Sequence, residues 1–148
     1  METDESEQLH ALFMDLVRSA GLLRSDQELP GFSVSMSQAY AIHELDHGDG
    51  PISQRELADR LLLEKSTVSR MVADLEDKGL LERERDPNNR RTYRLRLTDK
   101  GREFHARMGE NFGAQFREWT AALTAAERKA LLIGLPALIR VVRVTLPS

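Results

Sequence analysis

The chain has no cysteine, few aromatic residues and no long hydrophobic run. Without cysteine it can form no disulfide, cysteine-based metal site or thiol-based peroxide sensor, and this is compatible with a reducing cytosol. Aromatic residues make up only 5% of the 148 residues, so the core must consist mainly of Leu, Val, Ile and Ala. The acidic start METDESEQ lacks the basic region of a signal peptide, and the strongly apolar run 130–139 is too short to span a bilayer. We expect a cytoplasmic protein without a membrane partner.

Two short helices joined by a turn are predicted in the middle of the chain. Ser53 and Glu56 have the spacing of a capping box, which starts the first helix. Residues 61–64 form the turn, and Gly79 suits the position after the second helix, because glycine adopts positive φ at little cost. Four residues at helical spacing are expected to face inward from the second helix: Val68, Met71, Val72 and Leu75.

The opposite face of the second helix is polar and basic. It carries Lys65, Ser66, Thr67, Ser69 and Arg70. Short hydroxyl groups beside long cations at a helix N-terminus suit base edges and phosphates. Taken alone, an ordinary solvated helix face explains the same pattern equally well.

A basic hairpin is predicted directly after these helices. Residues 80–85 have strand character, residues 86–89 have the composition of a turn, and residues 92–97 alternate between apolar and basic positions. Arg90 and Arg91 lie near the expected tip, where two guanidinium groups suit an electronegative minor groove. Helix, turn, helix and basic hairpin together predict a winged helix-turn-helix, a DNA-binding module.

The sequence resembles the MarR family of bacterial transcriptional regulators. The matching residues are Gln38, Arg55-Glu56-Leu57-Ala58, Ser66-Thr67-Val68-Ser69-Arg70, Leu75-Glu76-Asp77-Lys78-Gly79-Leu80, Arg90-Arg91 and Leu97-Thr98-Asp99-Lys100-Gly101. The chain departs from the family pattern in two places. Asn89 stands where relatives have a wing carboxylate that holds the second arginine, and Glu64, a poorer cap, precedes the recognition helix.

The charge distribution fits a DNA-binding lobe on an acidic body. The net charge is −3, but residues 65–107 contain 12 Lys+Arg and 8 Asp+Glu, so the remainder carries −7. The positive charge is therefore concentrated in the second helix and the hairpin.

The two ends of the chain are predicted to be amphipathic helices. Apolar residues recur at three- and four-residue steps before residue 24 and again after residue 104. This is more apolar surface than a winged helix can cover, and the resemblance implies pairing of these helices in a homodimer. We expect a mainly α protein with a small β-hairpin wing, divided into residues 1–34 (dimerisation helix and linker), 35–99 (winged helix-turn-helix) and 100–148 (dimerisation helices). The alternative is that the arms fold back on their own lobe.

One motif points to different chemistry. His43-Glu44-Leu45-Asp46-His47 fits H-E-x-x-H, in which two imidazoles bind zinc and the glutamate acts as a general base. A zinc-dependent hydrolase is therefore an alternative, as is a regulatory metal site that uses His43, His47 or His105. The preferred interpretation is four scattered histidines, no metal, no cofactor and no enzymatic activity.

Taken together, the sequence predicts a homodimeric, sequence-specific regulator, more a repressor than an activator. The helix residues 65–70 are expected to read the major groove of double-stranded DNA, and Asn88, Asn89, Arg90 and Arg91 to reach the minor groove or its phosphates. The resemblance also implies a small, aromatic or anionic effector. The candidate ligand-binding residues are Leu12, Leu16, Tyr40, His43 and Phe104. A sequence-independent architectural DNA-binding protein remains the alternative that shares the charge pattern.

Overall fold

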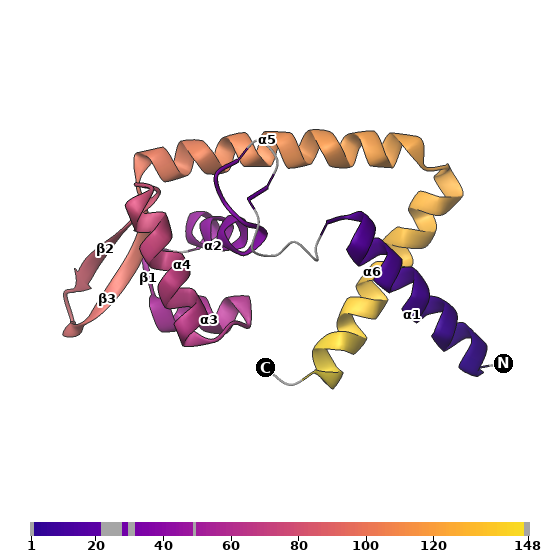
Figure 1. Cartoon of the computed structure of the whole chain (residues 1–148), viewed down its shortest axis with the longest axis horizontal. Coiled ribbons are helices and arrows are strands. Elements are labelled where there is room, and N and C mark those ends of the chain that lie inside the picture. The colour runs from indigo at the N-terminus through magenta and orange to yellow at the C-terminus, as the bar shows by residue number, and fades with distance from the viewer. Residues whose placement is uncertain (1, 22–27, 30–31, 49, 147–148) are drawn as a thin grey trace. The chain divides into compact units, whose positions relative to one another are not determined.

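The computed structural model describes residues 2–21, 28–29, 32–48 and 50–146. Helices and strands follow in the order α1 (Glu2–Ser19), α2 (Met36–His47), β1 (Ile52–Ser53), α3 (Gln54–Leu61), α4 (Lys65–Asp77), β2 (Leu81–Asp86), β3 (Asn89–Leu97), α5 (Asp99–Ala122) and α6 (Ala125–Thr145) (Figure 1). The chain divides into two compact units, Met1–Ala39 and Tyr40–Ser148. Part of the predicted linker before residue 35, residues 22–27 and 30–31, lies outside the described residues. No described helix is long and apolar enough to cross a membrane.

A three-stranded antiparallel sheet confirms the small β component and adds one strand to it. The order of the strands is β1-β3-β2, so β3 is central. The two residues of β1 pair with β3, with Ile52 opposite Leu95. The sequence analysis did not predict β1, because two residues are too short to show a strand period. Its pairing ties the start of the helix-turn-helix to the wing.

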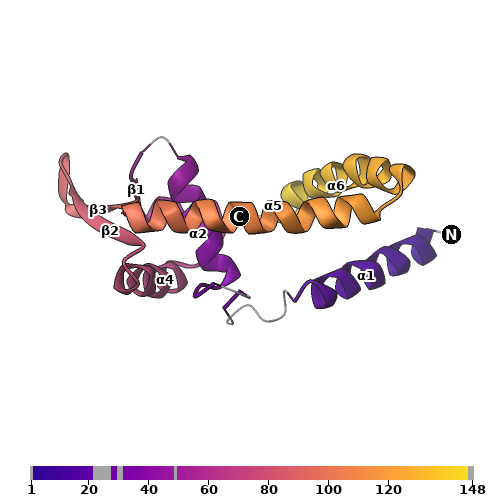
Figure 2. The same cartoon turned by 90° about the horizontal axis from the view of Figure 1, so that it is seen from above.

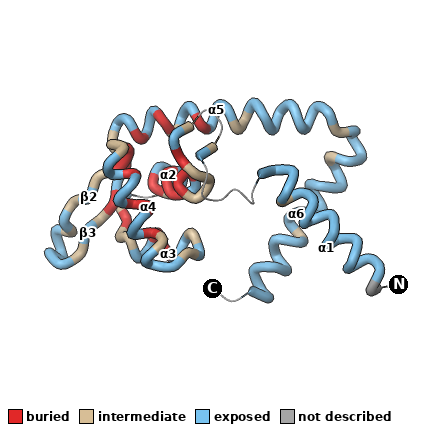
Figure 3. The backbone as a smooth tube through the Cα atoms, in the orientation of Figure 1, coloured by how far each residue is buried: buried red, intermediate tan, exposed pale blue. Residues whose placement is uncertain are grey.

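Buried residues concentrate in the winged helix (Figure 3). The four predicted inward positions of α4 are all buried, together with Leu57 and Ala58 of α3 and Leu80, Leu81 and Leu95 around the sheet. The start of α5 closes this core with Phe104 and Met108. This core fixes α4 and the wing relative to each other, because interiors packed this closely deform little.

Side-chain caps determine where several helices begin. Ser53 Oγ accepts a hydrogen bond from Glu56 N, which confirms that half of the predicted capping box. Thr98 caps α5 in the same way, and Thr124 and Glu127 form a complete capping box on α6. A further box begins α2, where Ser35 Oγ accepts from Gln38 N and Gln38 Oε1 accepts from Ser35 N. Its S-x-x-Q spacing is visible in the sequence but was not used in the prediction.

The terminal helices leave most of their apolar side chains exposed. None of the residues of α6 is buried, and the helix continues through Pro136. On α1, Leu12 and Leu16 are 65% and 59% exposed. In Figure 3 both helices are almost entirely pale blue or tan. The end of the predicted apolar repeat before residue 24, residues 22–23, lies outside the described residues.

Candidate nucleic-acid interface

The N-terminal half of α4 presents the polar face that the sequence predicted. Lys65, Ser66, Ser69 and Arg70 are exposed and Thr67 is half-buried, while the opposite face of the helix packs into the core. Glu64 occupies the N-cap position and makes no side-chain capping hydrogen bond. Amide groups in the first turn of α4 therefore remain available, as in helix N-termini that meet phosphates.

The turn between α3 and α4 contains an unusual backbone conformation. Leu62 adopts φ 55° and ψ 41°, the left-handed region that favours glycine. It is the one described non-glycine residue with positive φ, and its side chain is 73% exposed. This conformation reverses the chain within three residues and sets the angle at which α4 leaves α3. The predicted turn over residues 61–64 is confirmed.

The wing is a longer hairpin than the sequence predicted. The predicted turn over residues 86–89 is confirmed: Asp86 pairs with Asn89, Pro87 and Asn88 are the two central residues, and β3 already begins at Asn89. Asp86 Oδ1 accepts from Asn88 N at 2.9 Å. A hydrogen bond from a backbone N–H to the side chain of an aspartate two residues earlier stabilises a turn of this kind.

A bulge carries the two arginines of the tip. Arg85 pairs with Tyr93 and Asp86 pairs with Asn89, so residues 90–92 lie between these pairs in a bulge of β3. Asn89 Oδ1 accepts from the backbone N of Arg91 at 3.1 Å. The side chain of Asn89 therefore orders the backbone beside Arg91, a role that differs from holding its guanidinium. In Figures 1 and 2 the hairpin extends away from α2 and α4.

The arginines further along the hairpin are neutralised by acidic partners. Arg96 Nη2 lies 2.6 Å from Glu82 Oε1, and the hydrogen bond and charge of Glu82 raise the pKa of Arg96. Arg94 lies 3.6 Å from Glu84, and Arg83 of β2 lies 3.5 Å from Glu76 of α4. These pairs cross between strands or between strand and helix. They stiffen the base of the wing and cancel its charge.

Four cations of the candidate interface are unpaired. Among the residues that the structure describes, Lys65, Arg70, Arg90 and Arg91 form no ion pair, and all four are exposed. Arg85 differs, because its guanidinium lies 5.1 Å from the centre of the Tyr93 ring and donates to Arg90 O. The acidic side chains of the lobe thus neutralise the structural arginines and leave positive charge at the tip of the wing and the start of α4.

The proposed ligand-binding residues have mixed environments. Tyr40 and His43 are exposed on α2, whereas Phe104 is buried in α5 with the Arg107 guanidinium 5.6 Å from its ring centre. Leu12 and Leu16 are exposed on α1, in the other unit. A ligand site made of these residues stays a prediction.

The histidines are not scattered, and that expectation is wrong. His43 and His47 of α2 meet His105 of α5, with one ring nitrogen of each within 4.8 Å of the others. From the sequence alone, only His43 and His47 could be assigned to one helix face. His105 lies 62 residues after His43, so its approach depends on the fold. Glu44, the general base of the hydrolase alternative, instead has its carboxylate 3.7 Å from Arg60 Nη1 of α3.

Comparisons with known proteins agree with this architecture. Residues 32–92 match the sequence model of the MarR family. An uncharacterised HTH-type transcriptional regulator of Bacillus subtilis, YdgJ, is 33% identical over 99 residues, which cover 67% of this chain and 60% of the relative. The chain spans 50% and 42% of the lengths of two further bacterial regulators that it matches.

Solved structures share the fold over nearly the whole chain. PcaV from Streptomyces coelicolor, solved with its natural ligand, is 28% identical with a TM-score of 0.69 and 90% coverage of both chains. FabT from Streptococcus pneumoniae, solved with DNA, is 22% identical with a TM-score of 0.70, covering 96% of this chain and 97% of FabT. The family model, the matching motifs and these relatives show that residues 32–92 of the chain form a MarR-family winged helix.

Proposed function

We propose that the protein is a sequence-specific DNA-binding transcriptional regulator that acts as a homodimer. The observation that carries this proposal is the set of four exposed, unpaired cations on α4 and the wing, Lys65, Arg70, Arg90 and Arg91. Unpaired surface cations neutralise phosphates without first losing an internal partner. α4 enters the major groove, and the wing reaches the minor groove or the flanking backbone.

The hydroxyl groups of α4 support base reading in addition to phosphate binding. Ser66 and Ser69 are exposed beside Arg70, so hydrogen-bonding groups of two lengths share one helix face. Arginine suits guanine in the major groove, and serine donates to or accepts from several bases. Hydroxyl and guanidinium groups on one helix face support sequence-specific binding. A sequence-independent architectural protein would need only the cations, for contacts with phosphates.

The exposed apolar faces of α1, α5 and α6 support the homodimer. Phe116 and Trp119 of α5 are 61% and 51% exposed, and Leu132 of α6 is 77% exposed. A contiguous apolar surface on a soluble chain marks an interaction site. A second copy supplies the same surface, and two-fold pairing sets the spacing of two recognition helices for a pseudo-palindromic operator.

Repression relieved by a small molecule is the remaining part of the proposal. PcaV, which is similar to this chain, was solved with its natural ligand. An aromatic or anionic effector would act here only if it binds the DNA-incompetent arrangement of the dimer more tightly than the competent one. Tyr40 and His43 are the exposed polar candidates for contacting it.

Selection of binding sites from a randomised DNA library tests this function. The wild-type protein should enrich a two-fold symmetric site, and Arg70→Ala and Ser66→Ala should weaken binding to it by on the order of 1–3 kcal/mol, with relaxed preference in at least one of them. Arg117→Ala is the control, because it removes an exposed arginine of α5 that follows the winged helix in the chain. Binding without enrichment of any sequence would instead indicate an architectural protein.

A further inference from the structure

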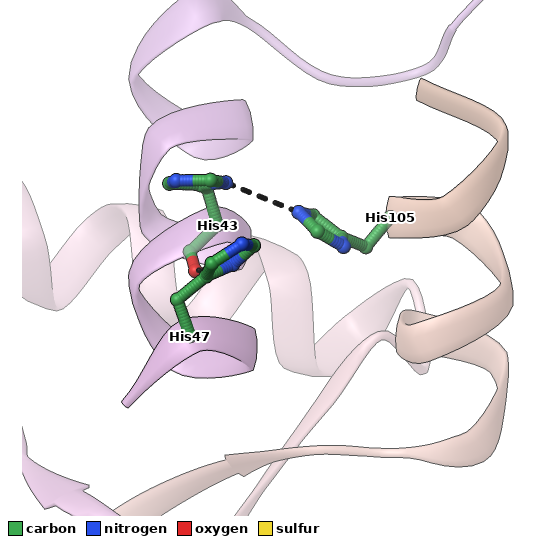
Figure 4. Close-up of side chains that lie close together, drawn as sticks. All are labelled: His43, His47 and His105. Carbon is green, nitrogen blue, oxygen red and sulfur yellow. Dashed lines mark hydrogen bonds between the residues drawn. The ribbon is translucent and has the colours of Figure 1, made fainter. Parts of the chain in front are cut away.

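Three of the four histidines of the chain form a cluster between α2 and α5. His43 and His47 lie one turn apart on α2, and His105 faces them from α5 (Figure 4). The ring centres of His43 and His47 are 4.0 Å apart, and that of His105 lies 5.4 and 5.3 Å from them. His43 and His47 are exposed and His105 is half-buried, so an ion from solvent can reach the cluster.

The contacts of His105 aim its Nε2 atom toward His43. His105 Nδ1 lies 3.0 Å from Asp46 Oδ2, and the nearby carboxylate favours the ring proton on Nδ1. Nε2 is then unprotonated in the neutral ring, and it lies 3.2 Å from His43 Nδ1. The neutral imidazole is the form that binds metals.

A second hydrogen bond orients His47. Its Nδ1 lies 3.2 Å from the backbone carbonyl oxygen of His43, which can only accept. Nδ1 of His47 therefore donates, and Nε2 is left with a free lone pair. Histidines that bind metals usually donate their other ring N–H to a carboxylate or a backbone carbonyl. His105 and His47 each have one of these two arrangements.

The spacing of the nitrogen atoms fits a tetrahedral ion. With zinc–nitrogen bonds of about 2.0–2.1 Å, two ligands of a tetrahedral zinc lie about 3.3 Å apart. The His43–His105 pair is already at 3.2 Å, and the remaining ligand atoms lie within 4.8 Å of one another. His47 is exposed, so its side chain can shift to bring its free ring nitrogen closer to the other two. When Nδ1 of His43 binds the metal, the ring takes its other neutral tautomer, with the proton on Nε2.

We propose that His43, His47 and His105 bind one Zn²⁺ ion, with water at the fourth position and Asp46 as a positioning residue. Imidazole ligands favour zinc and its neighbours over Mg²⁺ or Ca²⁺, which take oxygen ligands. The ion joins α2 to the start of α5 and so fixes how α5 leaves the winged helix. Its role is structural or regulatory and not hydrolytic, because the carboxylate of Glu44 is paired with Arg60.

Zinc titration of the tag-free protein, in competition with a chromophoric chelator, tests this site. The wild type should bind one Zn²⁺ per chain, and His43→Ala, His47→Ala and His105→Ala should each lower the affinity at least about tenfold. Asp46→Asn keeps the size of the side chain but removes its charge, and it should lower the affinity about 10- to 100-fold. His10→Ala is the matched control, because it removes the exposed histidine of α1 and should leave the affinity unchanged.

Two further measurements keep the result decisive. Circular dichroism of each variant separates loss of the site from loss of the fold, and His47→Ala, at an exposed position, carries the test if His105→Ala unfolds. Co²⁺ should give the intense visible absorption of a tetrahedral complex in the wild type only. Zinc affinity that is equal in the wild type and the folded cluster variants, or binding of Ni²⁺ or Cu²⁺ without Zn²⁺, would overturn the proposal. The assay contains no DNA, so it is independent of the proposed regulatory function.

Discussion

Gly101 approaches the backbone of Leu80 so closely that a Cβ atom on Gly101 would lie 2.0 Å from the carbonyl oxygen of Leu80. That oxygen accepts a hydrogen bond from Thr98 N, directly before α5. Thr98 in turn donates from Oγ1 to Gly79 O at 2.6 Å. The first turn of α5 is therefore packed against the junction of α4 and β2, and a side chain at position 101 has no room.

Gly101→Ala should destabilise the protein by about 3 kcal/mol or more, because backbone must move to admit the methyl group. Gly109→Ala is the matched control on the same helix: nothing lies within 4 Å of a Cβ at position 109. This control should gain up to about 1 kcal/mol, since alanine is the better helix former. Thermal unfolding at one protein concentration measures both. Equal midpoints for the two variants would contradict the close approach of Gly101 and Leu80.

Leu62→Gly should stabilise the protein by about 1 kcal/mol. The left-handed backbone conformation of Leu62 costs free energy of folding, whereas glycine adopts it without strain. The Leu62 side chain is 73% exposed, so its removal loses little packing. Leu62→Ala separates the two effects, because it removes the side chain but keeps the backbone strain. Chemical denaturation should rank glycine above both alanine and the wild type. Stabilisation by alanine of the same size would show that the exposed leucine, and not the backbone, is the cause.

Local patterns predicted the helix-turn-helix well because its signals lie within a few residues. Val68, Met71, Val72 and Leu75 were predicted to be inward from helical spacing alone, and all four are buried. Gly79 was predicted to end α4 and has φ 74°. Hydrophobic periodicity and capping residues act over one or two helical turns, so they can be recognised in a single sequence without knowledge of distant contacts.

Features that depend on contacts distant in sequence were missed. The pairing of Ile52 with Leu95 joins segments 43 residues apart in number, and a two-residue strand has no period of its own. The approach of His105 to His43 depends on how α5 packs on α2. The turn over residues 86–89 was predicted, but the bulge of residues 90–92 was not, because it depends on the register of pairing between β2 and β3.

The dimer proposal predicts that charge on α6 will separate the subunits. Leu132 and Ile139 are seven residues apart on one side of α6 and are 77% and 48% exposed. The double variant Leu132→Asp, Ile139→Asp should sediment as a monomer instead of a dimer, because burying two unpaired carboxylates per chain in the interface is too costly. Asp at the exposed Lys129 and Arg140 of the same helix is the control and should leave the dimer intact. A wild type that sediments as a monomer at micromolar concentration would refute the proposal itself.

Loss of the first 24 residues should abolish tight operator binding while each lobe still folds. All buried residues in the described part of the chain lie at or after Val34, so the deletion removes none of them. Two half-sites are read together only when the two lobes are held at a fixed spacing, and their linkage raises the effective concentration of the second lobe. Gel-shift titration against a full operator and a single half-site measures this. Full affinity for the complete operator after the deletion would show that α1 does not contribute to the dimer.

The wing prediction depends on the difference between a paired and an unpaired arginine of one strand. Arg91 forms no ion pair among the described residues, whereas Arg96 lies 2.6 Å from Glu82 and 3.6 Å from Glu84. Arg91→Ala should lower operator affinity and make the slope of log affinity against log salt shallower by about one unit, because one phosphate contact is lost. Arg96→Ala removes the same charge from β3 but should leave the slope unchanged.

Substitutions of Asn89 distinguish two contributions to operator affinity, the ordering of the wing backbone and the charge of the wing. Asn89 Oδ1 accepts from Arg91 N, and aspartate keeps that acceptor but adds a negative charge near DNA. Asn89→Asp should therefore change operator affinity by less than about 1 kcal/mol, since better ordering of Arg91 and repulsion from phosphate oppose each other. Asn89→Ala loses the acceptor and should weaken binding without changing the salt slope, because Arg91 keeps its charge but not its position. Identical affinities and slopes for the wild type and Arg91→Ala would mean that the wing does not touch DNA, and α4 would then be the only reader.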